Sequence, residues 1–251
     1  MTQIREIGGL IARYQIEEIK LTGGEPLLHP DILEIIHTFK SIPSVKDISL
    51  TTNGLLLDKM AGPLKSAGLQ RINIGCDTIN KSSVKSLNNI YSSIIATKNA
   101  GFSPIKLNMV LLKGINDTSI EDMVQYTQNE GIDLQIIELI NTDDEFYRQY
   151  HVDLAVAEQI LLPRTKRIVT KPMNDRKQFY LDENYYVELV RPMENHHFCA
   201  NCHTLRISHD YHFQPCLNRE DNLVPIGNNI EFAFQEALKR RMPFYVCTQK
   251  R

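Results

Sequence analysis

The chain has 251 residues, of which 42% are hydrophobic and 23% charged, and its formal net charge is -2. This length and composition can bury a full core, and the small charge gives no reason to expect a nucleic acid or a membrane surface as partner. No stretch approaches the ~20 apolar residues of a spanning helix, and residues 1–5 lack the features of a signal peptide. We therefore predict a cytoplasmic protein, in which clustered cysteines are metal ligands or catalytic thiols more often than disulfides.

Helix and strand patterns alternate along residues 1–141. A helical pattern over residues 4–14 comes first, and five strand patterns follow at intervals of roughly 25 to 30 residues, which is typical of repeated βα units. The predicted strands are residues 16–21, 46–52, 71–77, 105–111 and 133–139. The predicted helices between them are residues 31–39, 57–67, 84–99 and 120–129. Such a repeat requires parallel strands joined by right-handed crossovers.

Polar residues recur in these strands, which would otherwise be continuous apolar segments. They are Lys20, Thr22, Ser49, Thr51, Asn73, Lys106, Asn108, Gln135 and Glu138. Because βα loops at the carboxyl ends of barrel strands build active sites, the repetition favours a shared ligand cavity over solvated edge residues. The first strand runs into Thr22-Gly23-Gly24-Glu25-Pro26, where two glycines allow a ligand to approach the backbone, although a plain strand-to-helix turn is the alternative.

Beyond residue 141 the βα alternation stops. We predict that the acidic residues 142–145 form a solvated loop and not a metal site, and that residues 154–160 form a helix. Residues 167–170, 177–181 and 185–191 are predicted strands of a small antiparallel addition, and residues 230–241 are the last helix. We therefore divide the chain into an incomplete barrel, residues 1–141, and a C-terminal extension, residues 142–251.

Three of the five cysteines lie in this extension as C-x2-C-x13-C, at Cys199, Cys202 and Cys216. Two thiolates three residues apart and a third that returns from a hairpin can hold one metal centre. The missing fourth cysteine suggests a centre with an open position, but spacing alone equally allows a structural zinc site completed by a nearby histidine. Cys76 and Cys247 stand alone, and we predict that both are buried bystanders.

Several short motifs together resemble one known family. They are KLTGGEPL at residues 20–27, LTTNG at 50–54, RINI at 71–74, KGIND at 113–117, RPM at 191–193 and the three-cysteine stretch. The chain is similar to the molybdenum cofactor biosynthesis protein A (MoaA) family, the GTP 3',8-cyclases of the radical S-adenosylmethionine (SAM) superfamily, and most of all to its archaeal members. The resemblance implies an α/β fold, a partial (β/α)6 TIM-type barrel that here lacks its first strand, with a small C-terminal antiparallel extension that carries the cysteine cluster.

The resemblance also implies two [4Fe-4S] clusters and GTP as substrate. One cluster, held by an N-terminal C-x3-C-x2-C, cleaves SAM to a radical that removes the 3' hydrogen of GTP, and the other leaves one iron open to guanine. By resemblance, Cys199, Cys202 and Cys216 hold the second cluster, and Gly24 contacts SAM through its backbone. The residues expected to bind GTP are Lys20, Thr51, Lys106, Thr204 and Arg206. The expected product is 3',8-cyclo-7,8-dihydro-GTP, and cyclic pyranopterin monophosphate synthase is the expected downstream enzyme.

The chain departs from the family pattern at several positions. No cysteine precedes Cys76, so the ligands of the SAM-cleaving cluster are absent, and we expect an N-terminally truncated chain more than a natural remnant. Thr204 stands at the first of two arginine positions, Gly75 at a serine position, and residues 249–251 at a pair of glycines. Two alternatives stay open: a non-catalytic remnant that binds nucleotide and a metal (zinc or one [4Fe-4S] cluster), and a radical SAM peptide maturase. Whether the chain forms a homodimer is also open.

Overall fold

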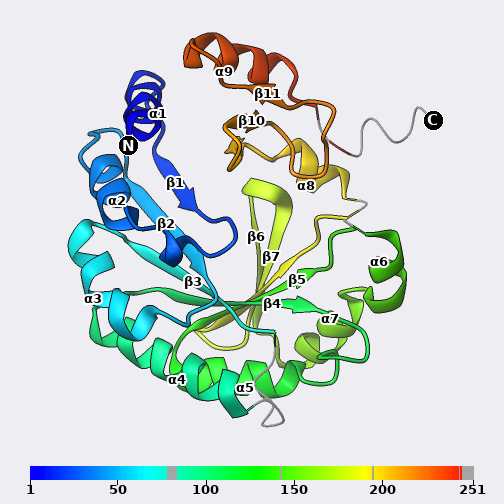
Figure 1. Cartoon of the computed structure of the whole chain (residues 1–251). Coiled ribbons are helices and arrows are strands. Elements are labelled where there is room, and N and C mark those ends of the chain that lie inside the picture. Colours follow the sequence, from blue (N-terminus) through cyan, green and yellow to red (C-terminus); the bar gives the residue numbers. More distant parts are fainter. Residues whose placement is uncertain (78–83, 142, 194, 243, 245–251) are drawn as a thin grey trace.

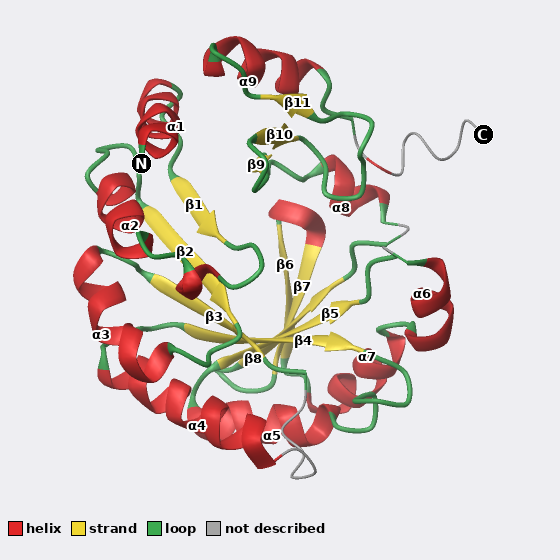
Figure 2. Ribbon diagram, viewed as in Figure 1, coloured by secondary structure: helices red, strands yellow, loops and turns green. Residues whose placement is uncertain are grey.

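The computed structural model describes residues 1–77, 84–141, 143–193, 195–242 and 244. Its main feature is one eight-stranded sheet that curls round, with helices along its outside (Figures 1 and 2). The strand order in this sheet is β1-β2-β3-β4-β5-β8-β7-β6. Within the described ranges, none of the helices combines the length and the apolar character needed to span a bilayer.

The first half of the sheet consists of the five parallel strands that the sequence predicts. They are β1 (Glu18–Leu21), β2 (Asp47–Thr52), β3 (Arg71–Gly75), β4 (Ile105–Leu111) and β5 (Asp133–Glu138). The helices around them are α1 (Thr2–Arg13), α2 (Ile32–Lys40), α3 (Leu57–Ala67), α4 (Val84–Asn99) and α5 (Ile120–Glu130). The predicted βα alternation is therefore confirmed.

Each inner strand has one apolar and one polar face. In β4, Leu107 and Met109 are fully buried in the main core, whereas the intervening Lys106 and Asn108 are half-buried on the opposite face. Because side chains alternate along a strand, the isoleucines and leucines pack beneath the helices and the polar residues share the other face. We call this second face, which is turned away from α2 to α5, the inner face.

Three further strands complete the sheet. They are β6 (Arg167–Lys171), β7 (Arg176–Tyr180) and β8 (Tyr186–Val190). They are antiparallel to one another, as predicted, but they are not a separate addition, because β8 pairs in parallel with β5. Val187 and Leu189 of β8 join the main hydrophobic core, so these strands continue the barrel beyond residue 141.

The acidic segment after β5 differs from the prediction, since it starts a helix. Helix α6 (Asp144–Tyr150) begins directly after Asp143, whose carboxylate accepts the backbone N–H groups of Glu145 and Phe146. Acidic residues in a first turn are stabilised by the positive end of the helix dipole. The segment is followed by α7 (Ala155–Leu161). Short 3-10 turns occur at Pro26–Leu28, between β1 and α2, and at Leu162–Arg164 and Met173–Asp175.

The cysteine stretch lies in a small second layer. It contains α8 (His196–Ala200) and the antiparallel strands β9 (Arg206–Ile207), β10 (His212–Gln214) and β11 (Val224–Pro225), followed by α9 (Ile230–Lys239). Phe213 and Phe234 form a separate core with Leu10 of α1, and the Tyr14 hydroxyl donates to Glu231 at 2.9 Å. The first and last helices thus lie side by side (Figure 1), which anchors the extension against the barrel.

Candidate functional site

The glycine-rich turn after β1 is fastened to the end of β2 by Glu25. One carboxylate oxygen accepts the Thr52 hydroxyl at 2.7 Å, and the other accepts the Asn53 N–H at 2.7 Å. Gly23 has a φ of 135°, a backbone conformation that would be strained in a residue with a side chain. A Cβ added to Gly24 would meet no described atom within 4 Å, so packing does not explain this glycine and a ligand has room at its backbone.

Cations from strands far apart in the sequence gather at the inner face, four from the large sheet and one from the second layer. They are Lys20 on β1, Arg71 on β3, Lys106 on β4, Arg176 on β7 and Arg206 on β9. Burial lowers the pKa of the Lys20 ammonium group, and the positive charges of the other four lower it further. The side chain of Lys20 is nevertheless exposed to solvent. The structure therefore brings Lys20, Lys106 and Arg206 near one another in a region that is accessible to a ligand.

Glu188 of β8 lies among these cations and is not one of the site residues that the sequence predicts. It is 1% exposed, accepts a bond from Arg176 Nη1 at 3.0 Å and lies 3.4 Å from Lys106 Nζ. The side-chain amides of Gln135 and Gln178 also donate to it. Burial raises the pKa of Glu188, but Lys106, Arg176 and the two amides outweigh burial and hold the pKa below its usual range.

Thr51 and Asn108 have polar atoms without protein partners. Thr51 Oγ1 and Asn108 Oδ1 are buried, and neither has a hydrogen-bond partner among the residues that the structure describes. Both side chains belong to the inner face, where Thr51 lies beside Asn73 in the pairing of β2 and β3. An unsatisfied buried polar group costs about 1–3 kcal/mol, so these two atoms suit hydrogen bonds from a ligand.

The three clustered cysteines line one pocket of about 110 Å³. Cys199 lies in α8, Cys202 follows that helix, and Cys216 follows β10. The apolar part of the lining includes Ile140, Pro192, Phe198, Pro215 and Leu217. Over the described ranges, no three histidine, cysteine or acidic side chains are grouped as ligands of one metal ion.

The environment of Cys202 favours its thiolate. Burial raises the pKa of this thiol, but hydrogen bonds from Thr204 and Asn174 and the charge of Arg241 outweigh burial and lower it. Thr204 donates through both its backbone N–H and its side chain. Because thiolates are the form that binds metals, this environment suits a metal or cluster ligand. Thr204, which the resemblance assigns to GTP, therefore contacts the cysteine site.

Arg206 joins the cysteine pocket to the cations of the inner face. It lines the pocket with Cys202 and Cys216. Burial lowers the pKa of its guanidinium, whereas these two cysteines raise it. The charge of Arg206 also acts on Lys20. Arg206 therefore belongs to the cysteine pocket and lies within electrostatic range of Lys20.

The KGIND motif has a structural role. Asn116 of the KGIND motif is fully buried and donates to the carbonyl oxygens of Asp77 and Val110, which ties the ends of β3 and β4 together. Cys76 is buried, as predicted. Cys247 and the C-terminal residues 249–251 lie outside the described residues.

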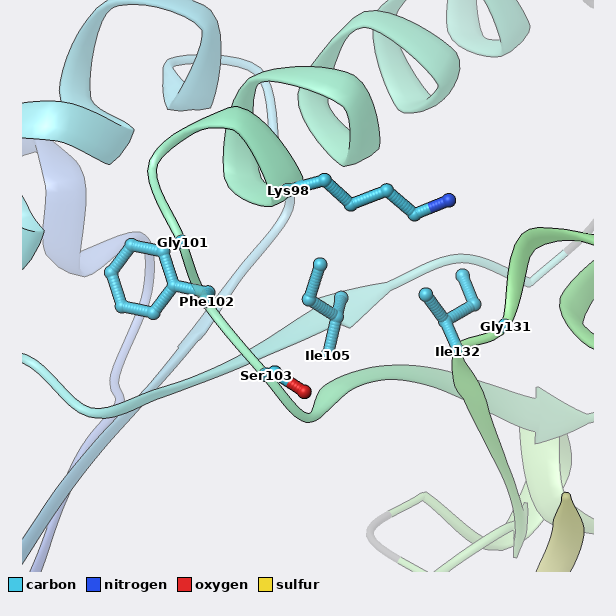
Figure 3. A pocket seen from close by; sticks show the side chains of 7 residues that line it. All are labelled: Lys98, Gly101, Phe102, Ser103, Ile105, Gly131 and Ile132. Carbon is cyan, nitrogen blue, oxygen red and sulfur yellow. The ribbon is translucent and has the colours of Figure 1, made fainter. Parts of the chain in front are cut away.

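A hollow at the opposite end of the barrel contains none of the predicted site residues. It has a volume of about 340 Å³, and its lining includes Phe102, which precedes β4, Ile105, which starts β4, and Ile132, which precedes β5 (Figure 3). Lys98, at its rim, is paired with Glu130 at 2.6 Å. The hollow shares no lining residue with the cysteine pocket, and we assign no function to it.

The fold and the first part of the sequence define the class of protein. The Radical SAM superfamily model matches residues 2–127. A crystal structure of Streptococcus suis SuiB bound to S-adenosylmethionine superposes with a TM-score of 0.68 at 13% identity, and it covers 91% of this chain and 57% of that chain. The chain thus has the barrel of the radical SAM superfamily, whose members use SAM and iron–sulfur clusters.

The second half of the chain and its relatives define the family. The Molybdenum Cofactor Synthesis C model matches residues 132–246. A probable GTP 3',8-cyclase of Methanothermobacter marburgensis is 40% identical over 92% of this chain and 81% of its own length. Another, from Methanocella arvoryzae, is 36% identical over 97% of this chain and 81% of its own length. The chain belongs to the GTP 3',8-cyclase family of molybdenum cofactor biosynthesis, as the sequence motifs indicated.

Proposed function

We propose that this chain holds GTP for 3',8-cyclisation, with the base near the three cysteines and the triphosphate at the cations of the inner face. The observation that carries this proposal is the position of Arg206, which is close to Cys202, Cys216 and Lys20. One extended nucleotide can therefore reach both groups. The cyclised product would then pass to cyclic pyranopterin monophosphate synthase.

At the base end, we propose that Cys199, Cys202 and Cys216 hold a [4Fe-4S] cluster. Their common pocket and the lowered pKa of the Cys202 thiol support this ligand set. When bound, such a cluster supplies an iron atom without a protein ligand. Thr204 donates hydrogen bonds to the Cys202 sulfur, which orients it, and Arg206 contributes positive charge beside the thiolates.

At the phosphate end, Lys20 and Lys106 supply positive charge for the triphosphate. Lys106 is held from one side by Glu188, and Lys20 has no ion pair among the described residues. Phosphate oxygens form charge-assisted hydrogen bonds with such groups, and these bonds are strong in a partly desolvated site. The Thr51 hydroxyl, which has no partner among the described residues, is available to the ribose or the base of the same nucleotide.

SAM is proposed to lie against the turn after β1, where the backbone of Gly24 is open. The residues present do not fit the SAM-cleaving cluster, because the chain has no cysteine before Cys76 and Cys76 is buried. The chain's own contribution is to bind and orient the substrate.

GTP binding tests this proposal directly. We expect Lys106→Ala to weaken GTP binding by about tenfold to a hundredfold, since a hydrogen bond to a charged group contributes about 1.5–3 kcal/mol. Lys98→Ala is the matched control, because Lys98 is a cation at the opposite end of the barrel, paired with Glu130. Calorimetric titration of the anaerobically reconstituted protein measures both affinities. Equal GTP affinity in Lys106→Ala and the unmodified protein would contradict the proposed position of the triphosphate.

A further inference from the structure

We propose that Arg176 is a further phosphate-binding residue of this site and that Glu188 is the positioning residue that holds it. The inference rests on the proposed function, since it concerns the triphosphate end of the same nucleotide. Neither Arg176 nor Glu188 belongs to the motifs that indicated the family. Both lie in the antiparallel part of the sheet, beyond the parallel strands that the sequence predicts.

The guanidinium of Arg176 is only partly used by the protein. Its Nη1 atom donates to Glu188 Oε1 at 3.0 Å. Its Nε atom is buried and has no acceptor among the described residues. A guanidinium has five N–H donors in a fixed fork, and phosphate matches this fork with two oxygens. The Arg176 side chain therefore retains donors for a bidentate contact with an anion.

The neighbours of Arg176 define a site for a polyanion. Lys106 Nζ lies 3.4 Å from the same Glu188 oxygen that accepts from Arg176. Among the charged groups that act on Lys20, Arg176 has the largest effect. The three cations therefore converge from β1, β4 and β7, although β1 and β7 do not pair in the sheet.

The charges of this group do not cancel. Asp133 is the second nearby carboxylate, and it accepts the Tyr186 hydroxyl at 2.7 Å. Counting Glu18, Asp133 and Glu188 against Lys20, Lys106, Arg176 and Arg206 leaves an excess of one positive charge. Arg71 is neutralised separately by Asp47. The phosphate oxygens of a nucleoside triphosphate would compensate this excess.

Glu188 gives the cations a defined spacing. Gln178 faces Glu188 in the pairing of β7 and β8, and Gln135 faces it in the pairing of β5 and β8. Both amides donate to the carboxylate, so it is fixed from two strands. Since the carboxylate in turn contacts Lys106 and Arg176, it prevents the two cations from moving apart by repulsion. A bound triphosphate would meet cations that are already in place.

Separate probes for the two ends of the nucleotide test the inference. Inorganic tripolyphosphate and guanosine are titrated into the unmodified protein, Arg176→Gln, Arg176→Lys and the control Arg167→Gln. Arg167 is an exposed cation on the neighbouring strand, stacked 3.8 Å from the centre of the Tyr180 ring. We expect Arg176→Gln to weaken tripolyphosphate binding at least about tenfold and to leave guanosine binding and the control unchanged. Arg176→Lys should give intermediate affinity, because it keeps the charge but not the fork.

The outcomes separate this inference from the proposed function. If Arg176→Gln binds tripolyphosphate like the unmodified protein while Lys106→Ala binds it weakly, the proposed phosphate-binding role of Arg176 is wrong and the proposed function stands. If neither variant loses tripolyphosphate affinity, both are wrong. Equal losses for tripolyphosphate and guanosine would indicate a purely structural arginine and also overturn the inference. Arg176→Lys preserves the ion pair with Glu188, so it provides the same comparison if Arg176→Gln does not fold.

Discussion

Replacing Glu188 by glutamine tests the electrostatic organisation of the inner face. The substitution keeps the shape of the side chain but removes the charge that faces Arg176 and Lys106, and it directs an amide NH2 group towards other donors. Glu188 is 1% exposed, so solvent does not replace the lost interaction. Removing one partner of a buried pair costs about 3–5 kcal/mol, and because the two cations are partly exposed we expect a loss at the lower end of this range, about 3 kcal/mol.

The pH dependence of this loss has a definite sign. The pKa of Glu188 in the folded protein is held below its ordinary value of 4.5. The carboxylate therefore contributes its full stability above about pH 4.5, and the contribution disappears as the pH falls through the folded-state pKa. Denaturant unfolding of the unmodified protein and Glu188→Gln between pH 7 and pH 3 measures the difference. Equal free energies of unfolding at pH 7, or a difference that grows on acidification, would refute this reasoning.

Two further substitutions test the local structure around the site. Asn116→Ala should lower the free energy of unfolding by about 2–3 kcal/mol, because the fully buried amide donates to two carbonyl oxygens and accepts the Leu112 N–H. Chemical denaturation measures this loss, and a change below about 0.5 kcal/mol would contradict the prediction. Asp143→Ala should lower the free energy of unfolding by about 1 kcal/mol, because the Asp143 carboxylate caps α6. Asp143→Asn should retain most of that stability, since asparagine is also a good cap. Equal losses in the two variants would show that capping is not the cause.

The barrel elements could be predicted because their signals are local. Apolar periodicity identifies helices and strands, and glycines mark their ends, as Gly68 and Gly131 do in left-handed conformations after α3 and α5. The parallel pairing of β8 with β5 joins strands separated by two helices and a hairpin, so no local sequence pattern predicts this pairing. Helix α6 was missed because it buries none of its residues and therefore has no apolar stripe.

The candidate site was predictable only in part. The cysteine spacing and the family motifs select residues that the structure brings together, and Arg206 connects them to the cations. Glu188 and Arg176 carried a weaker signal, a charged residue within or at the start of an otherwise strand-like segment. Such residues are usually solvated at sheet edges, and only the folded sheet shows that these two face Lys106.

The metal content of the reconstituted protein is the most direct test of the central claim, that the three cysteines hold an iron–sulfur cluster beside the nucleotide site. After anaerobic reconstitution we expect about four iron and four sulfide per chain. Cys202→Ala should lose both, whereas Cys76→Ala, which alters a buried cysteine outside the pocket, should retain them. One zinc per chain without sulfide, or an iron content unchanged in Cys202→Ala, would contradict the claim.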